Sequence, residues 1–432
     1  MASTQVENDD KTTITKKLTI KKVLSQKTRK KLVMPFLNNK NNKFTVESCG
    51  IQNAGENVIG FIGDYYKIEI VFKEGNDRRK IKYFMKSLPS DVAKAEKIKE
   101  AGYFNRESNV YTNILSKFDN VQISTEYHAK CPLSTDSDIV LEDLHEQGYR
   151  TTNSRETFDR NHCQVALTSL AKFHAGSWIL EDHARSKLTK EEFRIEDEFK
   201  DFLTECGYKY EQWFIAGMEA ALTAAGESEK YGKGTEYFEK IKSKWEAVFR
   251  QALEHCFPSK IFRNVMCHRD LWANNIMFNY DGDTKPVNCI LVDFQTCRCM
   301  PPMGDVVSLL YLNLTRTRRQ NDFCDLIRHY YTELDKELGL HGIAVKEIVT
   351  WKDFRNQCEV YKIWALVQCA ILLQVALLEP ADVKEVLSEG DYDRLLNRRS
   401  EFVLYVMKKD PVYKERMLDS VEEIIELFCL KD

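Results

Sequence analysis

The chain has 432 residues, of which 43% are hydrophobic and 30% are charged, and its formal net charge is −3. These values are ordinary for a soluble globular protein with room for two domains, and the net charge favours neither an acidic nor a basic partner. Thirteen cysteines at irregular spacing exclude a regular disulfide framework, and Cys297 and Cys299 are too close in sequence for a zinc C-x-x-C pair. We expect reduced thiols and a cytoplasmic location.

The N-terminal segment, residues 1–45, is basic: it holds 11 Lys or Arg residues against three acidic residues. Polar, Lys-rich segments of this kind are usually solvated, so we predict a flexible segment here. An electrostatic arm for a membrane or a nucleic acid is the alternative interpretation. A transit peptide fits less well, because the segment begins with acidic residues. For the protein as a whole we expect no nucleic-acid partner.

Residues 46–145 are rich in strand patterns and are predicted to form a small N-terminal lobe that binds nucleotide. Phe61–Phe72 alternates between apolar and polar residues from Tyr66 onward, Glu74–Asp77 is typical of a turn, and Lys80–Lys86 predicts the return strand. Lys86 ends that strand, where an ammonium can pair with phosphates. A solvated strand lysine is the alternative.

A predicted helix, Phe104–Phe118, follows the hairpin and carries Glu107 beside its apolar face, where a carboxylate could hold Lys86 in place. The segment Ala54–Gly63 contains three glycines and could cover phosphates, or it could be an ordinary hairpin turn. A buried strand then ends at Glu142. Backbone groups from Glu142 to Leu144 could bind the adenine of a nucleotide.

Residues 146–432 are predicted to form a larger helical lobe that carries the catalytic and substrate-binding groups. The run Ile363–Leu378 is short for a bilayer and contains Gln368 and Gln374, so we expect a buried helix and no transmembrane segment. His174 is expected to be a core histidine. The predicted helices are Phe158–Trp178, Phe199–Ala225, Tyr237–Phe257, Val306–Leu338, Trp351–Leu378 and Val412–Leu430.

The most informative motif is Cys267–Asn275, which is followed by a predicted hairpin and by Leu291–Gln295. Asp270 and Asn275 precede this hairpin in the sequence and Asp293 follows it, so the three residues lie on either side of one hairpin. Phosphoryl transfer from ATP uses such a set: a carboxylate accepts the proton of the attacking hydroxyl, and an amide oxygen and a second carboxylate bind Mg²⁺. The alternative is a buried aspartate that caps a helix, followed by a solvated turn.

With these motifs, and with Val140–Leu144 and Leu170–Ala175, the chain resembles the ecdysteroid kinase-like family over residues 50–420. The resemblance implies an α+β fold of the bilobal protein-kinase-like class, with ATP and Mg²⁺ as cofactors. It also implies Asp270 as catalytic base, Asn275 and Asp293 as metal ligands and Lys86 as the phosphate lysine. The chain departs from the group at Arg269, where members commonly have glycine.

The resemblance implies an ATP-dependent kinase whose acceptor is a hydroxyl on a lipophilic small molecule, such as an ecdysteroid or a related alcohol. A catalytically silent protein that binds nucleotide or ligand on the same fold is the alternative. A protein kinase is disfavoured, because Gly304–Asp305 follows Asp293 too closely for a long activation segment and Gln295 stands where a glycine is expected. The oligomeric state cannot be read from these patterns.

Overall fold

The structure is a computed structural model that describes residues 24–38, 43–55, 63–188, 193–203, 212–379, 381–383 and 398–431. The chain divides into two compact units. One covers the chain through Gln52 together with Ile68–Ile81, and the other covers Asn53–Lys67 and continues from Lys82. The lobe boundaries predicted near residues 45 and 145 stay a prediction.

The first unit contains a short helix, α1 (Gln26–Val33), inside the segment for which the sequence predicts flexibility. The hydroxyl of Ser25 accepts the N–H of Thr28 at 3.1 Å and so caps the helix. Leu32 and Val33 are fully buried. This part of the segment is helical, with two adjacent apolar residues packed inside, and the flexibility of residues 1–45 stays a prediction. Residues 1–23 lie outside the described part of the chain.

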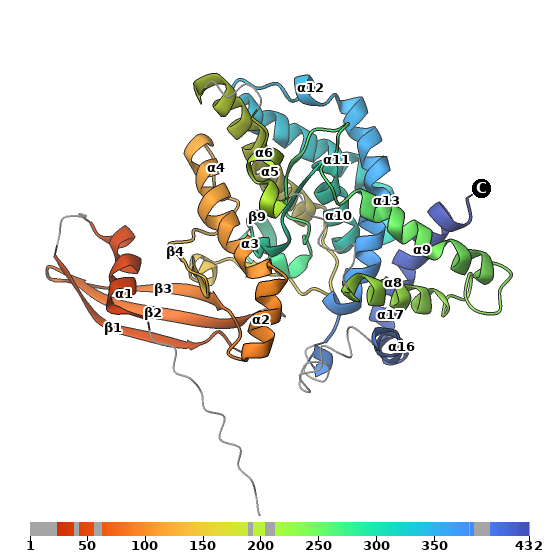
Figure 1. The fold of residues 1–432 in the computed structure, drawn as a ribbon, viewed down its shortest axis with the longest axis horizontal. Helices are drawn as coiled ribbons and strands as arrows, with labels where there is room; N and C mark the ends of the chain where they lie inside the picture. The colour runs from red at the N-terminus through yellow and green to blue at the C-terminus, as the bar shows by residue number, and fades with distance from the viewer. Residues whose placement is uncertain are drawn as a thin grey trace, which may run out of the picture. The chain divides into compact units, whose positions relative to one another are not determined.

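Five strands form one sheet in the order β1-β2-β3-β5-β4 (Figure 1). The predicted hairpin and its return strand are present, and the turn residue Gly75 has a φ of 61°, which favours glycine. β3 and β5 pair antiparallel, with Lys86 opposite Ile139. Of the predicted phosphate-covering segment, residues 56–62 lie outside the described residues. The strand bounds are β1 Phe44–Asn53, β2 Asp64–Glu74, β3 Asp77–Ser87, β4 Leu133–Ser134 and β5 Asp138–Glu142.

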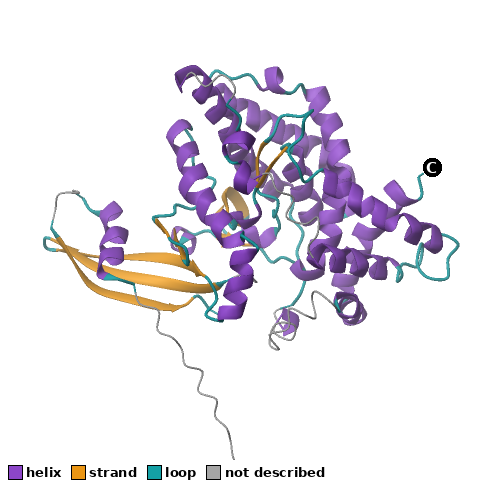
Figure 2. Ribbon diagram, in the orientation of Figure 1, coloured by secondary structure: helices purple, strands orange, loops and turns teal. Residues whose placement is uncertain are grey.

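The rest of the chain is mostly helical (Figure 2). The α-helices after the sheet hairpin are α2 Val92–Glu100, α3 Tyr103–Asn109, α4 Ser116–Val121, α5 Arg160–Leu188, α6 Ile195–Glu198, α7 Lys200–Leu203, α8 Gln212–Ala225, α9 Phe238–Glu254, α10 Met303–Asn313, α11 Arg316–Gly339, α12 Val345–Ile348, α13 Trp351–Ala376, α16 Arg399–Lys409 and α17 Pro411–Ile424. Short 3₁₀ turns are η1 Met34–Phe36, η3 Leu144–Gln147, η4 Ala273–Asn275 and η5 Phe294–Thr296, and π-helical turns cover Val110–Leu115 and Ile425–Cys429.

Several helices differ from the predicted bounds. The single helix predicted over Val306–Leu338 is two helices, because Leu314 is extended and the hydroxyl of Thr315 caps α11 by accepting the N–H of Arg318. Of the helix predicted over Phe199–Ala225, the structure describes α7 and α8, and residues 204–211 lie outside the described residues. Helix α16 has no counterpart among the predicted helices.

Helix α5 supports the strands of the second unit that matter most for the site. The hydroxyl of Ser169 donates to the carbonyl of Cys289 at 2.8 Å. The hydroxyl of Ser177 accepts the N–H of Met266 at 2.9 Å. Because these two contacts lie two helical turns apart on one helix, α5 holds the strand of Met266 and the strand of Cys289 in fixed positions relative to each other.

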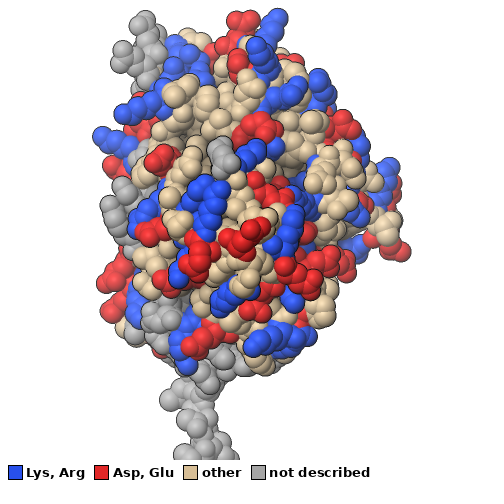
Figure 3. Space-filling model, turned by 90° about the vertical axis from the view of Figure 1, so that its right-hand side faces the viewer, with Lys and Arg blue, Asp and Glu red and all other residues tan. Residues whose placement is uncertain are grey.

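Helix α13 is long and apolar enough to cross a membrane by length and composition, but 78% of its most apolar window is buried inside the structure. The cysteines among the described residues are free thiols. On the face shown in Figure 3, basic and acidic side chains are interspersed, with no broad area of one sign.

Candidate active site

Two short antiparallel ladders position the site. β7 (Val265–Cys267) pairs with β10 (Arg298–Met300), and β8 (Ile276–Asp281) pairs with β9 (Lys285–Leu291). The segment from β7 to β8 and the segment from β9 to β10 therefore run next to each other. A third, two-residue strand, β6 (Arg150–Thr151), extends the second ladder. All residues of the cluster described below belong to the second unit.

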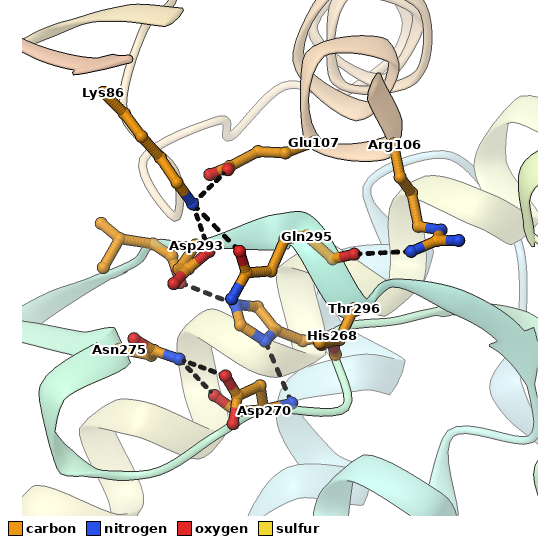
Figure 4. A network of polar contacts seen from close by, with 10 residues as sticks. Lys86, Arg106, Glu107, His268, Asp270, Asn275, Asp293, Gln295 and Thr296 are labelled. Atoms are coloured by element: carbon orange, nitrogen blue, oxygen red, sulfur yellow. Dashed lines mark hydrogen bonds and ion pairs between the residues drawn. The ribbon is translucent and has the colours of Figure 1, made fainter. Parts of the chain in front are cut away.

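Lys86 is the centre of a buried network of polar contacts (Figure 4). Its Nζ donates to Glu107 Oε2 at 2.6 Å, to Asp293 Oδ1 at 3.0 Å and to Gln295 Oε1 at 3.1 Å. The side chains of Lys86 and Glu107 are only 5% and 2% exposed. The structure thus brings together Lys86, Glu107 and Asp293, which belong to separate predicted elements. Gln295 is a further member of this network, which the sequence did not predict.

The charges of this network support one another. Burial works to lower the pKa of Lys86, but the carboxylates of Asp293 and Glu107 offset it and hold that pKa well above its ordinary value. Burial also raises the pKa of Glu107, and the ammonium of Lys86 opposes that rise. The lysine is therefore positively charged at neutral pH, which is the state that attracts phosphate oxygens.

Asp293 begins the short turn η5 with a φ of 67° and a ψ of 65°. This left-handed conformation is uncommon for a residue other than glycine. It directs the carboxylate to Lys86, while the side chain remains 27% exposed. Asp293 is therefore the part of the network that can reach a ligand from solvent.

His268 ties the two segments of the site together. Its Nε2 lies 2.9 Å from the carbonyl of Val292, and its Nδ1 lies 3.3 Å from the backbone nitrogen of Asp270. These partners require a donor at Nε2 and an acceptor at Nδ1, which is one neutral tautomer. Burial lowers the pKa of His268, which favours the same uncharged form. The role of His268 is not apparent from its motif.

Asp270 and Asn275 face each other. The Nδ2 of Asn275 donates to the backbone carbonyl and to Oδ2 of Asp270, both at 2.9 Å. Burial and the nearby charge of Asp293 raise the pKa of Asp270 to about 7, against the hydrogen bond from Asn275. The backbone carbonyl of Asn275 accepts the N–H of Val292 at 3.0 Å, which places Asn275 beside the segment that carries Asp293.

Asp305, near the start of α10, holds the backbone of the segment that carries Asp270. Its carboxylate accepts the N–H of His268 at 2.5 Å and the N–H of Arg269 at 2.8 Å. Arg269 has a φ of 69°, and these contacts hold it in that conformation. His174 lies 3.2 Å from the same carboxylate, and its other ring nitrogen lies 2.7 Å from the hydroxyl of Tyr330. His174 is a buried core histidine, as expected, but one linked to the site.

The two connector residues predicted to bind adenine lie outside this network. The carboxylate of Glu142 accepts the backbone N–H of Lys130 at 2.9 Å and the amide of Gln147 at 2.8 Å. The carbonyl of Leu144 accepts the N–H of Tyr149 at 3.0 Å. The side chain of Glu142 is therefore engaged within the connector, and the adenine contact stays a prediction for backbone groups.

The donor set suits a hard cation. The amide nitrogen of Asn275 points to Asp270, so the amide oxygen of Asn275 points away from Asp270, as Figure 4 shows. Asp293 adds a partly exposed carboxylate. An amide oxygen and a carboxylate are ligands that Mg²⁺ prefers, and neither soft sulfur nor imidazole is among them.

The ecdysteroid kinase-like family matches residues 55–342 of this chain. The chain belongs to the ecdysteroid kinase-like family. The match spans the sheet hairpin, the Lys86–Glu107 pair and both segments that carry Asp270 and Asp293. The predicted membership is therefore confirmed. Among curated proteins, none matches the chain.

Solved structures with a similar course of the chain include an ethanolamine kinase from Plasmodium vivax, with 12% identity, a TM-score of 0.39 and 91% coverage of each chain. Choline kinase LicA from Streptococcus pneumoniae has 13% identity and a TM-score of 0.38, with 92% of this chain and 98% of that chain covered. The complex of gentamicin with APH(2'')-IIa has 11% identity and a TM-score of 0.37, with 92% and 99% covered.

The fold class of this family member is α+β and protein-kinase-like, as predicted: a small antiparallel sheet region precedes a larger helical region. The family membership supports a kinase-like protein. It does not by itself assign roles to Lys86, Asp270 or Asp293.

Proposed function

We propose that the protein is an ATP-dependent phosphotransferase that phosphorylates a hydroxyl of a lipophilic small molecule. The observation that carries the proposal is the convergence of Lys86, Glu107 and Asp293 on one buried network, next to the facing pair Asp270 and Asn275. Phosphoryl transfer depends on positioning and on neutralising charge, and this set supplies both.

In this proposal Lys86 pairs with phosphate oxygens of ATP, and Glu107 keeps the ammonium in place. The 2.6 Å contact with Glu107 fixes the Lys86 side chain before any nucleotide arrives. Prior fixing matters because a preorganised charge needs no rearrangement when the transition state forms. Backbone groups between Glu142 and Leu144 are proposed to contact the adenine.

Asp270 is the proposed base. A pKa raised to about 7 suits a carboxylate that must accept the proton of an acceptor hydroxyl near neutral pH. Asn275 donates one hydrogen bond to that carboxylate and one to the backbone carbonyl of Asp270, and so fixes the residue. The neutral His268 fixes the backbone of Asp270 relative to the segment that carries Asp293, so the two carboxylates keep their spacing.

Mg²⁺ is the proposed metal cofactor. Asn275, through its amide oxygen, and Asp293 would hold the ion, which supplies neutralisation of the charge on the phosphates. A small-molecule acceptor is favoured over a protein, because η5, β10 and the start of α10 occupy the chain directly after Asp293. A steroid or related alcohol is proposed on the strength of family membership.

The test is ADP release in the presence of ATP, Mg²⁺ and a panel of uncharged alcohols. Asp270→Asn and Asp293→Ala are expected to lower turnover by at least about 100-fold, since the first removes the proposed base and the second removes a proposed metal ligand. The matched control is Asp325→Asn, a 61% exposed aspartate. Full activity in both site variants would contradict the assigned roles. Tight binding of Mg²⁺ and ATP without turnover on any acceptor would instead favour a catalytically silent binding protein.

A further inference from the structure

The ammonium of Lys86 has three N–H groups, and each of them has an acceptor within the protein. The acceptors are Glu107 Oε2 at 2.6 Å, Asp293 Oδ1 at 3.0 Å and Gln295 Oε1 at 3.1 Å. A lysine side chain carries three donors and no more. A phosphate oxygen that takes a full hydrogen bond from Lys86 must therefore replace one of these acceptors.

Glu107 is poorly suited to be replaced. Its side chain is only 2% exposed, and it has the shortest of the three contacts with Lys86. Its carboxylate also accepts the backbone N–H of Phe294. Separation of Lys86 from Glu107 would leave a buried carboxylate without its counterion, which is strongly destabilising. This contact therefore persists when a ligand binds.

Asp293 has no need to leave either. It carries a full negative charge, and of the two carboxylates it contributes more to the raised pKa of Lys86. A carboxylate has two oxygens, so Oδ1 can remain on Lys86 while Oδ2 faces a ligand. Asp293 can thus act on a metal or a phosphate without giving up the ammonium.

Gln295 is the partner that a phosphate can replace. It is uncharged, and its contact with Lys86 is the longest of the three. A phosphate oxygen carries negative charge, so it is a stronger acceptor for an ammonium than the oxygen of an amide. Of the three possible exchanges, this one separates no pair of opposite charges.

The backbone of Gln295 is fixed independently of its side chain. Arg106 of α3 donates from a guanidinium nitrogen to the backbone carbonyl of Gln295 at 3.0 Å, and Arg106 is only 3% exposed. Figure 4 shows this contact on one side of Gln295 and the contact with Lys86 on the other. The exchange therefore requires rotation of the Gln295 side chain alone, while the turn η5 stays in place.

We propose that the amide of Gln295 is an internal competitor for phosphate. It binds one N–H of Lys86 until a phosphate oxygen of the nucleotide displaces it, and it returns to the ammonium when the nucleotide leaves. Gln295 thereby lowers the affinity for nucleotide and speeds the release of ADP. It acts through Lys86 and is a positioning residue. The inference rests on the proposed function, in which Lys86 binds the phosphates of ATP.

The test measures binding of ADP with excess Mg²⁺ to the full chain by isothermal calorimetry, and the melting temperature of the same proteins without nucleotide. Gln295→Leu removes the accepting oxygen at similar volume. Gln295→Met, an unbranched side chain whose sulfur accepts only weakly, is the second variant in case leucine does not pack. The control is Gln122→Leu, at a buried glutamine whose amide oxygen accepts the hydroxyl of Tyr127 at 2.6 Å.

Both Gln295 variants are expected to lower the Kd of ADP by at least about threefold, because loss of the competing contact leaves the ammonium open to phosphate in a larger share of the molecules. The same variants should lower the melting temperature without nucleotide, since a buried ammonium loses an acceptor. A residue with a purely structural role would lower the melting temperature without tightening the binding of ADP. That result is expected for Gln122→Leu.

Unchanged or weaker binding of ADP in the Gln295 variants would overturn the inference, and so would equal tightening in Gln122→Leu. Failure of the proposed function is recognised separately. If the wild type did not bind ADP, the proposed function would fail and this inference with it. If Lys86→Met weakened the binding of ADP while the Gln295 variants left it unchanged, only this inference would fall.

Discussion

The ammonium of Lys86 lies 3.0 Å from the carboxylate of Asp293, although 207 positions separate the two residues in the chain. The pair joins the end of strand β3 to the short turn after β9. Since the side chain of Lys86 is only 5% exposed, this contact and the one with Glu107 keep a buried charge compensated. The network therefore has a structural role in the second unit that does not depend on the proposed reaction.

Removal of Lys86 should therefore affect stability as well as activity. Lys86→Met leaves Glu107 buried without its ammonium and is expected to destabilise the protein by about 3–5 kcal/mol. The double variant Lys86→Met/Glu107→Gln should be more stable than Lys86→Met alone, because it no longer buries an unpaired carboxylate. Urea denaturation of the single and double variants measures this coupling. Lys80→Met, at a lysine whose side chain is 54% exposed, is the control and should change stability little. Additive effects would show that Lys86 and Glu107 act independently.

Asp305→Asn should impair turnover more than nucleotide binding. The amide that replaces the carboxylate has only one accepting oxygen, so at least one of the N–H groups of His268 and Arg269 loses its partner. We expect a loss of stability of about 1.5–3 kcal/mol and a clear fall in kcat with little change in the KM for ATP. Steady-state kinetics and thermal unfolding test this. A raised KM for ATP with an unchanged kcat would contradict the proposal that Asp305 supports the segment that carries Asp270.

Gly176→Ala should destabilise the protein even though alanine favours helices. Gly176 lies inside α5, where the exchange alone would add about 1 kcal/mol of stability. A Cβ at this position would lie 2.6 Å and 2.8 Å from ring carbons of Phe118, and overpacking of this kind costs about 1–3 kcal/mol. The cost of the clash should therefore exceed the gain in helix propensity, and Gly176→Ala should be less stable than the wild type. Gly339→Ala, at the last residue of α11 with no atom within 4 Å of its added methyl group, should have no such penalty. The melting temperatures of the two variants decide the question.

Glu426 should contribute stability that is lost in acid. Hydrogen bonds from Arg316, first of all, and from Lys230 and Tyr231 lower the pKa of Glu426 from 4.5 to about 2. Since the folded-state pKa is the lower one, the contribution is complete above about pH 4.5 and is lost as the pH falls towards about 2.

The measurement compares the free energy of unfolding of the wild type with that of Glu426→Gln between pH 8 and pH 3. The difference should be constant down to about pH 5 and should narrow below pH 4.5, the ordinary pKa of a glutamate. Glu415→Gln, at an exposed glutamate of α17, is the control. A difference between wild type and Glu426→Gln that widens in acid would have the wrong sign for this mechanism.

Local patterns in the sequence predict much of the site. The end of the return strand at Lys86, the hairpin between Asn275 and Asp293, and the apolar face next to Glu107 all follow from alternation, turn residues and helical spacing. These features are local, so a single sequence carries them. The catalytic and metal-binding roles assigned to these residues stay predictions.

What the sequence did not predict depends on contacts between distant residues. Gln295 lies beside Lys86, His268 joins two segments and Asp305 accepts backbone N–H groups through contacts between residues that are far apart in the chain. Helix bounds failed where a capping residue interrupts the predicted helix: Thr315 starts a new helix inside the segment that is predicted as one helix over Val306–Leu338. Docking of α1 likewise depends on a surface that no local pattern of residues 26–33 reveals.

The short path from Asp293 to α10 has a consequence for regulation. The chain uses this path for one turn of η5 and the three residues of β10, and α10 begins at Met303. Cys297, Pro301 and Pro302 are the residues of this path that lie outside these elements, so the path contains no long loop that a modification could refold. A switch that changes the network at Lys86 would therefore have to act from another part of the chain.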